Sequence, residues 1–377
     1  LVAPTEILAF QHFKNFKDKF ENLGLVVKVL TGSTKSSERK ILLNDLKNGS
    51  INLLIGTHAI FEQNVIFNNL GYAVIDEQHR FGVKQRSKIW EKNNPPPHVL
   101  IMTATPIPRT LTMSLYGDLD LSIINELPPG RKDVITVHRK DKNRLKVFGF
   151  IRGQIKQGRQ IYIVYPLIEE SKKMDLKYLE DGLESITREF DKENYSVGVM
   201  HGRMRSSNKD IEMNNFLNGK IDILISTTVI EVGVNVPNAS VMIIENAERF
   251  GLSQLHQLRG RVGRGKYDSY CVLMTNDKIS EDAKIRIEAM VNSNDGFKIS
   301  EVDLRLRGPG DVLGTKQSGV LDFKIADIID DESILFSVSN EADLLIKKDP
   351  QLNLNENYNI RSFILNNPIN KSWNEIG

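Results

Sequence analysis

The chain has 377 residues, of which 40% are hydrophobic and 26% charged, and its net charge is +2. This length and composition are ordinary for a soluble globular protein of two or three domains. Because the charges nearly balance, nucleic-acid binding would have to come from local basic patches and backbone amides. The single cysteine, Cys271, excludes an internal disulfide and fits a reducing compartment. No apolar run approaches the roughly 20 residues needed to cross a bilayer.

Apolar runs that end in small or polar residues alternate with segments of helical spacing along the chain. This alternation is typical of parallel β-sheets with helices on both faces. The runs predict ten strands, at residues 1–2, 26–30, 51–55, 72–75, 99–102, 161–164, 197–200, 221–225, 241–244 and 270–274. The intervening helical segments are residues 7–23, 36–48, 143–157 and 208–218.

Pro and Gly residues at 127–131 divide the ten strands into two sets of five. We therefore expect an α/β fold with two parallel-sheet domains in tandem, at residues 1–128 and 129–290, and a small C-terminal region at 291–377. Ligands of open parallel sheets bind beyond the carboxyl ends of the strands. We accordingly expect the carboxyl edges of the two sheets to face each other across one cleft.

Two acids, Asp76 and Glu77, come directly after one of the predicted strands. Mg²⁺ prefers carboxylate oxygens, water and phosphate, so Asp76 is a candidate magnesium ligand. Glu77 is then placed to orient or deprotonate a water, as the hydrolysis of a nucleoside triphosphate requires. The alternative is an ordinary strand end that runs into a polar loop.

A second cluster lies at residues 254–265, where Arg259, Arg261 and Arg264 alternate with glycines. The planar guanidinium matches phosphate oxygens and does not lose its proton. Arginines that reach a γ-phosphate from a second domain stabilise the charge of the transition state. The alternative is a general anion-binding or nucleic-acid-binding patch on a turn.

The C-terminal region begins with a glycine-rich basic stretch at residues 303–319, which includes Arg305, Arg307 and Lys316. Glycine lets the backbone approach a partner closely. Residues 333–348 have the spacing of an amphipathic helix that stops before Pro350. We expect the Asn-rich tail from Gln351 to pack as an extended arm or to fray.

Together these motifs resemble those of superfamily 2 helicases, in the family's order. The matching stretches are 3–6 (motif Ia), 76–79 (motif II, the Walker B box), 103–106 (motif III), 226–235 (motif V) and 257–264 (motif VI). Residues 76–83 and 103–111 are similar to the branch that holds RecG and the transcription-repair coupling factor. Since 307–319 resembles the RecG translocation motif, residues 1 to about 350 look like the helicase portion of the bacterial RecG family.

The resemblance implies two RecA-like domains that form an ATP-driven double-strand DNA translocase with ATP and Mg²⁺ as cofactors. Such a helicase remodels stalled replication forks and branch-migrates Holliday junctions in recombination and repair. It implies branched double-stranded DNA as the partner, with a single-stranded DNA-binding protein as a further candidate. It also implies a monomer in the bacterial cytoplasm, associated with the nucleoid. The coupling-factor motor is the related alternative.

The resemblance assigns roles to residues of the ATP site. Asp76 would hold Mg²⁺ through water, and Glu77 would activate the attacking water. The nucleotide sensors would be Gln78 and His79. Motif VI would supply Arg261 and Arg264 to the γ-phosphate, positioned by Gln257. Motif V would meet the nucleotide at Gly233 and Asn235.

A second group of residues is implied in binding DNA or in coupling hydrolysis to movement. Backbone amides and hydroxyls can follow a strand without reading its bases, as a translocase requires. These residues are Pro4, Thr5, Gly32, Gly56, Thr57, Thr103, Thr105, Thr227, Thr228, Arg305, Arg307 and Gln317. His201 is a further DNA-adjacent candidate, whereas His12, His98 and His138 show no partner pattern.

One family motif is absent from the sequence. No Gly-x-x-x-x-Gly-Lys-Ser/Thr occurs, although this P-loop binds the β- and γ-phosphates and lies just before motif Ia in the family. We therefore expect an incomplete first RecA-like domain in a fragment that also lacks the wedge domain. The chain alone would be inactive as an ATPase. The alternative is a fragment that binds DNA without hydrolysis.

Overall fold

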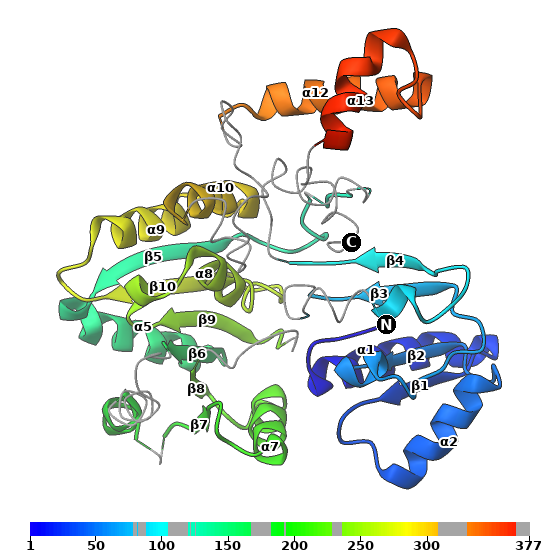
Figure 1. The fold of residues 1–377 in the computed structure, drawn as a ribbon. Helices are drawn as coiled ribbons and strands as arrows, with labels where there is room; N and C mark the ends of the chain where they lie inside the picture. The colour runs from blue at the N-terminus through cyan, green and yellow to red at the C-terminus, as the bar shows by residue number, and fades with distance from the viewer. Residues whose placement is uncertain are drawn as a thin grey trace.

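The computed structural model describes residues 1–77, 81, 88–104, 120, 122–124, 126–166, 182–191, 194–227, 236–307 and 330–366. Two parallel β-sheets form the body of the molecule, and a pair of helices near the C-terminus stands apart from both sheets (Figure 1). This arrangement confirms the predicted α/β class and its tandem order. The proposed boundaries at residues 128 and 290 stay a prediction.

The first sheet is assembled around residues 1–3. Its named strands are β1 (Val27–Leu30), β2 (Leu53–Gly56), β3 (Tyr72–Ile75) and β4 (His98–Ile101), paired in parallel as β1–β2 and β3–β4. Val2 forms parallel bridges to both Gly56 and Ile75. The Val2 amide donates to the Val74 carbonyl at 2.8 Å, and the Ala3 amide donates to the Gly56 carbonyl at 2.8 Å. Residues 1–3 thus join the two pairs, as the first predicted strand requires.

The second sheet has six parallel strands in the order β5-β10-β9-β6-β8-β7. Its strands are β5 (Val134–Lys140), β6 (Gln160–Tyr165), β7 (Val197–Met200), β8 (Ile223–Thr227), β9 (Ala239–Ile244) and β10 (Ser269–Thr275). The prediction of five was wrong because it missed β5. This edge strand alternates buried and exposed residues and ends in His138-Arg139-Lys140, so it has no continuous apolar run.

The central strands of the second sheet are buried on both faces, which explains their apolar sequence. On β6, Ile161 and Ile163 enter one hydrophobic cluster with helix α5 (Arg144–Lys156), while Tyr162 and Val164 enter the cluster on the opposite face. The latter cluster also contains Leu255 of helix α8 (Leu252–Arg259) and residues of α9 (Glu281–Asn292) and α10 (Gly296–Arg307). This cluster therefore packs α8 against the face of the sheet. Motif VI begins in α8 and continues beyond its end.

The helices pack on the faces of the sheets and connect their strands. They are α1 (Glu6–Phe20), α2 (Ser36–Lys47), α5 (Arg144–Lys156), α7 (Ser206–Leu217), α8 (Leu252–Arg259), α9 (Glu281–Asn292) and α10 (Gly296–Arg307). Short 3-10 turns are η1 (Glu21–Leu23), η2 (His58–Phe61), η4 (Asp141–Asn143) and η5 (Ala247–Arg249). The predicted helical segments match α1, α2, α5 and α7 to within a few residues. In the described part of the chain, no helix is long and apolar enough to cross a bilayer.

The C-terminal pair consists of α12 (Glu332–Lys348) and α13 (Tyr358–Asn366), with η6 (Asn355–Asn357) between them. Helix α12 confirms the predicted amphipathic segment. The prediction of an extended or frayed tail was wrong for residues 355–366. Asp349 accepts hydrogen bonds from the Asn353 and Leu354 amides at 2.9 and 2.8 Å, and this turn lets α13 begin.

Gly56 offers a test of the close packing in the first sheet. A Cβ atom there would lie 2.0 Å from the Leu30 carbonyl oxygen, so the backbone would have to move. We expect Gly56→Ala to lower the free energy of unfolding by about 1–3 kcal/mol. Chemical denaturation measures this loss. Gly71→Ala is the matched control, because no atom lies within 4 Å of its Cβ position. Equal stability of the two variants would contradict the packing argument.

Candidate ATP and DNA site

Asp76 and Glu77 lie where β3 ends, next to residues 1–3, which join the two strand pairs of the first sheet. The Asp76 amide donates to the Val2 carbonyl at 2.9 Å, which continues the sheet to the start of the acidic pair. Glu77 is 8% exposed and has a φ of 52°, a conformation that is costly for a residue with a side chain. Strained residues concentrate at functional sites, so this outlier supports a functional assignment for Glu77.

The Glu77 carboxylate is held from the next strand. The Ala104 amide, three residues after β4, donates to Glu77 Oε2 at 3.3 Å. Motif III therefore contacts motif II directly through a backbone group. Thr103 lies beside this contact at the end of the same strand.

His12 contacts the other acid, which the sequence interpretation missed. Its Nε2 lies 3.4 Å from Asp76 Oδ2, and the two side chains are 24% and 20% exposed. The statement that His12 has no partner pattern was therefore wrong. The residues are 64 positions apart, and His12 lies on α1, so only the fold could bring them together.

Motif VI reaches the amino edge of the second sheet. Helix α8 follows β9 and returns the chain along the sheet, as a right-handed crossover does. Gly263 then adopts a φ of 77°, and a Cβ there would lie 2.8 Å from Val134, the first residue of β5. The expectation that two carboxyl edges face each other was thus wrong. The arginines of the second domain come from the opposite edge of its sheet.

Arg261 and Arg264 follow α8, and Arg261 is buried whereas Arg264 is half-buried. Arg261 is 8% exposed, and Arg264 Nε donates to the Gly260 carbonyl at 3.1 Å. The pKa of Arg264 is lowered to about 10, first by burial and then by the positive charges of Arg261 and Arg131. Tyr162 and Glu77 act on this pKa in the opposite direction. Arg264 therefore stays charged at neutral pH, and the negative charge of Glu77 in the first domain favours that charged form.

Arg259 anchors the end of α8. Its guanidinium is 3% exposed and donates to the carbonyls of Met290 at 2.9 Å and Ser293 at 2.7 Å, at the end of α9. It also lies 3.1 Å from Nδ1 of His256, which must accept this hydrogen bond because arginine has no acceptor. The sequence interpretation grouped Arg259 with the two arginines that follow it, but the structure gives it separate partners. It fixes the turn from which they project.

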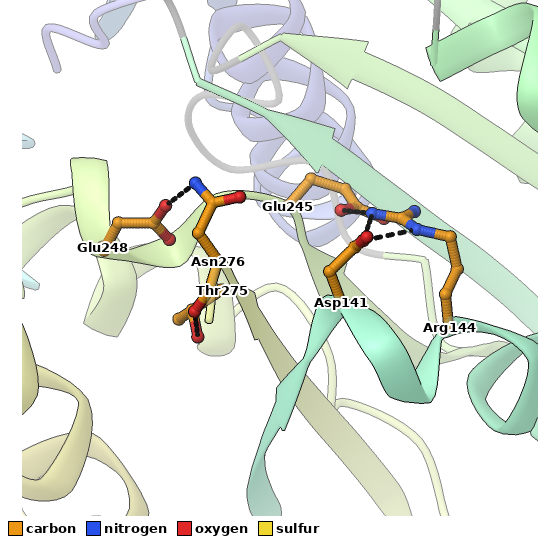
Figure 2. A network of polar contacts seen from close by, with 6 residues as sticks. All are labelled: Asp141, Arg144, Glu245, Glu248, Thr275 and Asn276. Atoms are coloured by element: carbon orange, nitrogen blue, oxygen red, sulfur yellow. Dashed lines mark hydrogen bonds and ion pairs between the residues drawn. The ribbon is translucent and has the colours of Figure 1, made fainter. Parts of the chain in front are cut away.

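The connection from β9 to α8 is pinned at the carboxyl edge of the sheet (Figure 2). Arg144 of α5 makes two hydrogen bonds to Glu245, at 2.7 and 2.8 Å, and also contacts Asp141. Burial alone would lower the pKa of Arg144, but Glu245 and Asp141 raise it overall. Farther along the connection, Asn276 donates to Glu248 Oε1 at 2.7 Å. Both ends of the motif VI helix are therefore held.

The DNA-binding candidates of the first domain gather at the carboxyl edge of its sheet. They follow three neighbouring strands and are Pro4, Thr5, Gly32, Gly56 and Thr57. Thr5 caps α1 by accepting a hydrogen bond from the Leu8 amide at 3.3 Å. The Thr57 hydroxyl is buried and has no hydrogen-bond partner within the described part of the chain. Gly56 already has a packing reason to be glycine, so it is the weakest of these candidates.

The candidates of the second domain lie at the ends of β7 and β8. The Thr227 hydroxyl and Nδ1 of His201 are both buried, and neither has a hydrogen-bond partner among the described residues. The pKa of His201 is lowered by burial and then by Lys209 and Arg203, so this histidine is neutral at pH 7. Unsatisfied buried polar atoms are rare in folded proteins and call for an explanation. A bound phosphate backbone that reshapes this edge would supply one.

Arg305 and Arg307 lie in the last turn of α10, which packs against α8. Arg307 Nε lies 3.0 Å from Asp303, and a Cβ at Gly251 would lie 2.1 Å from the Arg307 guanidinium. Asp303 in turn accepts a hydrogen bond from Ser253 at 3.1 Å. Arg305 contacts Asp330 at 3.1 Å on the surface. The start of the translocation motif thus contacts the first turn of the motif VI helix.

The remaining predicted site residues lie outside the described residues. They are Gln78, His79, Thr105, Thr228, Gly233, Asn235 and Gln317. Gln257 is described and lies half-buried on α8. Of the predicted catalytic set, the structure thus describes Asp76, Glu77, Gln257, Arg261 and Arg264, and both Glu77 and Arg261 act on the pKa of Arg264.

Three family models match the chain in order. They are the DEAD/DEAH box helicase at residues 1–114, the helicase conserved C-terminal domain at 142–266 and the ATP-dependent DNA helicase RecG, domain 3, C-terminal, at 293–367. The ATP-dependent DNA helicase RecG of Synechocystis sp. is 50% identical over 361 residues, which are 96% of this chain and 43% of that protein. RecG of Bacillus subtilis is 48% identical over 93% of this chain and 51% of that protein. The chain belongs to the RecG family. It spans about half the length of these relatives.

Solved structures agree with membership of the RecG family. A structure of RecG bound to a three-way DNA junction has a TM-score of 0.70 and 43% identity, covering 89% of this chain and 43% of that one. The helicase Lhr of Mycobacterium smegmatis, at 16% identity and a TM-score of 0.56, covers 78% of this chain and 41% of its own and shares the fold. These matches confirm the prediction of two RecA-like domains in tandem.

Asp76 of this RecG-family chain has the chemistry of a magnesium ligand. Its carboxylate is partly exposed at a strand end, and His12 Nε2 lies 3.4 Å from one of its two oxygens, Oδ2. Among the described residues, no three His, Cys, Asp or Glu side chains could hold a metal together. A Mg²⁺ ion at Asp76 would therefore need water and phosphate oxygens as its other ligands, which is the usual pattern for this ion with nucleotides.

His256 gives a test of how motif VI is anchored in this RecG-family chain. Its pKa is lowered from 6.5 to about 4, by burial and then by the charge of Arg259. The unfolded chain takes up a proton below pH 6.5 while the folded chain does not, so stability falls between pH 6.5 and pH 4. We expect this group to cost up to about 3 kcal/mol over that range. Denaturation at several pH values measures the loss.

The control is His256→Asn, whose amide oxygen can accept from Arg259 but does not titrate. Its free energy of unfolding should fall less between pH 6.5 and pH 4 than that of the wild type. Identical slopes would show that His256 is not held neutral in the folded chain.

Proposed function

We propose that this chain is the motor part of an ATP-dependent DNA helicase that translocates on duplex DNA. In the cell it would remodel stalled replication forks and branch-migrate Holliday junctions during recombination and repair. The observation that carries the proposal is the placement of Glu77 at the carboxyl end of β3 and of the motif VI arginines at the amino edge of the second sheet, where Glu77 acts on the pKa of Arg264. A hydrolytic acid and a phosphate-binding arginine on separate domains form a site that is complete only when the domains close.

The ATP site is assigned as follows in this proposal. Asp76 holds Mg²⁺ through water, and Glu77 orients or deprotonates the attacking water. Arg261 and Arg264 stabilise the charge on the γ-phosphate, and Gln257 helps to position them. Gln78, His79, Gly233 and Asn235 complete the set by resemblance to motifs II and V. The proposal assigns no residue of this chain to a P-loop, because the sequence contains no Gly-x-x-x-x-Gly-Lys-Ser/Thr.

The proposed DNA path follows the carboxyl edges of the two sheets. The buried, unsatisfied hydroxyls of Thr57 and Thr227 support it, because each lies at the end of a strand where a phosphate could accept a hydrogen bond. Thr103, Thr105 and Thr228 belong to the same proposed set. Arg305, Arg307 and Gln317 would couple domain closure to movement of the DNA, and the contact of Arg307 with Gly251 supports this assignment.

Branched double-stranded DNA is the proposed substrate, since the related RecG structure holds a three-way DNA junction. The proposal includes a monomer that acts near the nucleoid in the bacterial cytoplasm, with a single-stranded DNA-binding protein as a candidate partner. The second candidate function is DNA binding without hydrolysis, favoured by the lack of a P-loop in the printed sequence. For the 377-residue chain alone we expect no appreciable ATPase activity.

Substitution of Glu77 separates these two functions. In the full-length protein with forked DNA, we expect Glu77→Gln to lower phosphate release roughly a hundredfold or more, because the water loses its base. Glu91→Gln is the control, since Glu91 is exposed in the same domain. Equal turnover in Glu77→Gln and wild type would remove the proposed hydrolytic role. If the full-length wild type releases no phosphate with forked DNA, the non-hydrolysing function is correct.

Arg264 is the matching test from the second domain. We expect Arg264→Ala to abolish hydrolysis, because the transition-state charge loses its partner. Nucleotide affinity should change by less than about tenfold, or roughly 1.4 kcal/mol. Equilibrium binding of a fluorescent ATP analogue and phosphate release measure the two effects separately. Retained turnover would exclude Arg264 from contact with the γ-phosphate.

A further inference from the structure

We propose that His12 is a positioning residue for Asp76: through its Nε2 it fixes one carboxylate oxygen and leaves the other facing the metal site. The inference rests on the proposed ATPase function and extends it to a residue outside the helicase motifs quoted above. It would make helix α1 part of the metal site.

The contact has a defined chemical direction. A carboxylate is acceptor-only, so at the 3.4 Å separation from Asp76 Oδ2 it is His12 Nε2 that carries the hydrogen and donates. The hydrogen bond therefore requires no positive charge on the histidine. The His12 ring also lies 6.5 Å from the ring of Phe16, one turn later on the same helix. The imidazole is thus supported on one side and directed toward Asp76.

The contact is not needed to hold α1 in place. The helix is already fixed by Leu8 and Ala9, which are 4% and 0% exposed in a cluster with Val27 and Ile55. Asp76 is likewise fixed by the hydrogen bond that its amide donates to the Val2 carbonyl at 2.9 Å. His12 and Asp76 are both partly exposed, so the contact contributes little burial. What it does control is the rotation of the Asp76 carboxylate.

That rotation matters to a metal. Carboxylates that bind metals are themselves hydrogen-bonded, and loss of such an outer partner typically weakens metal affinity about 10–100-fold. With Oδ2 held by His12, Asp76 Oδ1 is the oxygen that can face a hydrated Mg²⁺. Without the His12 donor, the Asp76 carboxylate could rotate freely. Metal binding would then have to restrict that rotation, which would lower the metal affinity.

The test compares two side chains of similar length in the full-length protein. His12→Gln keeps an N–H donor, whereas His12→Met has none. Binding of Mn²⁺, in place of Mg²⁺, is followed by electron paramagnetic resonance with a non-hydrolysable ATP analogue present. We expect the Mn²⁺ dissociation constant to rise at least about tenfold in His12→Met and to stay near the wild-type value in His12→Gln. Asn15→Ala, on the exposed side of α1, is the control.

The outcomes distinguish the inference from the proposed function. Equal Mn²⁺ affinity in His12→Gln and His12→Met would overturn the positioning role, and so would tighter binding in His12→Met, which would mean that His12 competes with the metal. Asp76→Asn reports on the proposed function itself. If Asp76→Asn keeps the wild-type Mn²⁺ affinity, the metal assignment fails regardless of His12. Thermal melting of both His12 variants confirms that the comparison is made on folded protein.

Discussion

The electrostatic effect of Glu77 on Arg264 depends on the edges of the two sheets at which these residues lie. Glu77 lies at the carboxyl edge of the first sheet, directly after β3. Arg264 lies at the amino edge of the second sheet, because α8 carries the chain back along the strands before the arginines appear. The two groups can meet only when opposite edges of the two sheets approach each other. This geometry makes the proposed ATP site a junction between domains rather than a pocket within one.

The arginines are useful only if the loop that carries them is rigid. Arg259 fixes the end of α8 to the carbonyls at the end of α9, and Asp303 and Arg307 of α10 contact its beginning. Shared apolar side chains bind the three helices into one core cluster with the second sheet. A displacement of α10 is therefore transmitted to motif VI without an intervening flexible segment. At the carboxyl edge of the same sheet, the hydrogen bonds from Arg144 to Glu245 tie α5 to the end of β9 (Figure 2).

Much of the fold could be predicted because buried parallel strands are continuous apolar runs that end at polar residues. β5 was not predicted because its residues alternate between buried and exposed, as in an edge strand, and its last three residues are polar. The cleft was predicted in the wrong orientation because the rule for ligands at carboxyl edges applies to a single sheet and says nothing about a helix that returns to the other edge. His12 could not be found from the sequence, since its contact with Asp76 joins residues 64 positions apart. Acids after strands and arginines among glycines carry local signals, whereas a hydrogen bond across the fold carries none.

Helix α1 connects the proposed DNA-binding edge of the first domain with its proposed metal site. Its N-cap, Thr5, belongs to the proposed DNA-binding edge, and His12, two turns later, contacts Asp76 of the proposed metal site. A helix is stiff over this length, so a phosphate that shifts Thr5 would also shift the imidazole relative to the carboxylate. The hydrogen bond at 3.4 Å is near the limit of a useful contact and would respond strongly to a small displacement. The proposed DNA-binding edge and the proposed metal site are therefore linked through one helix within a single domain.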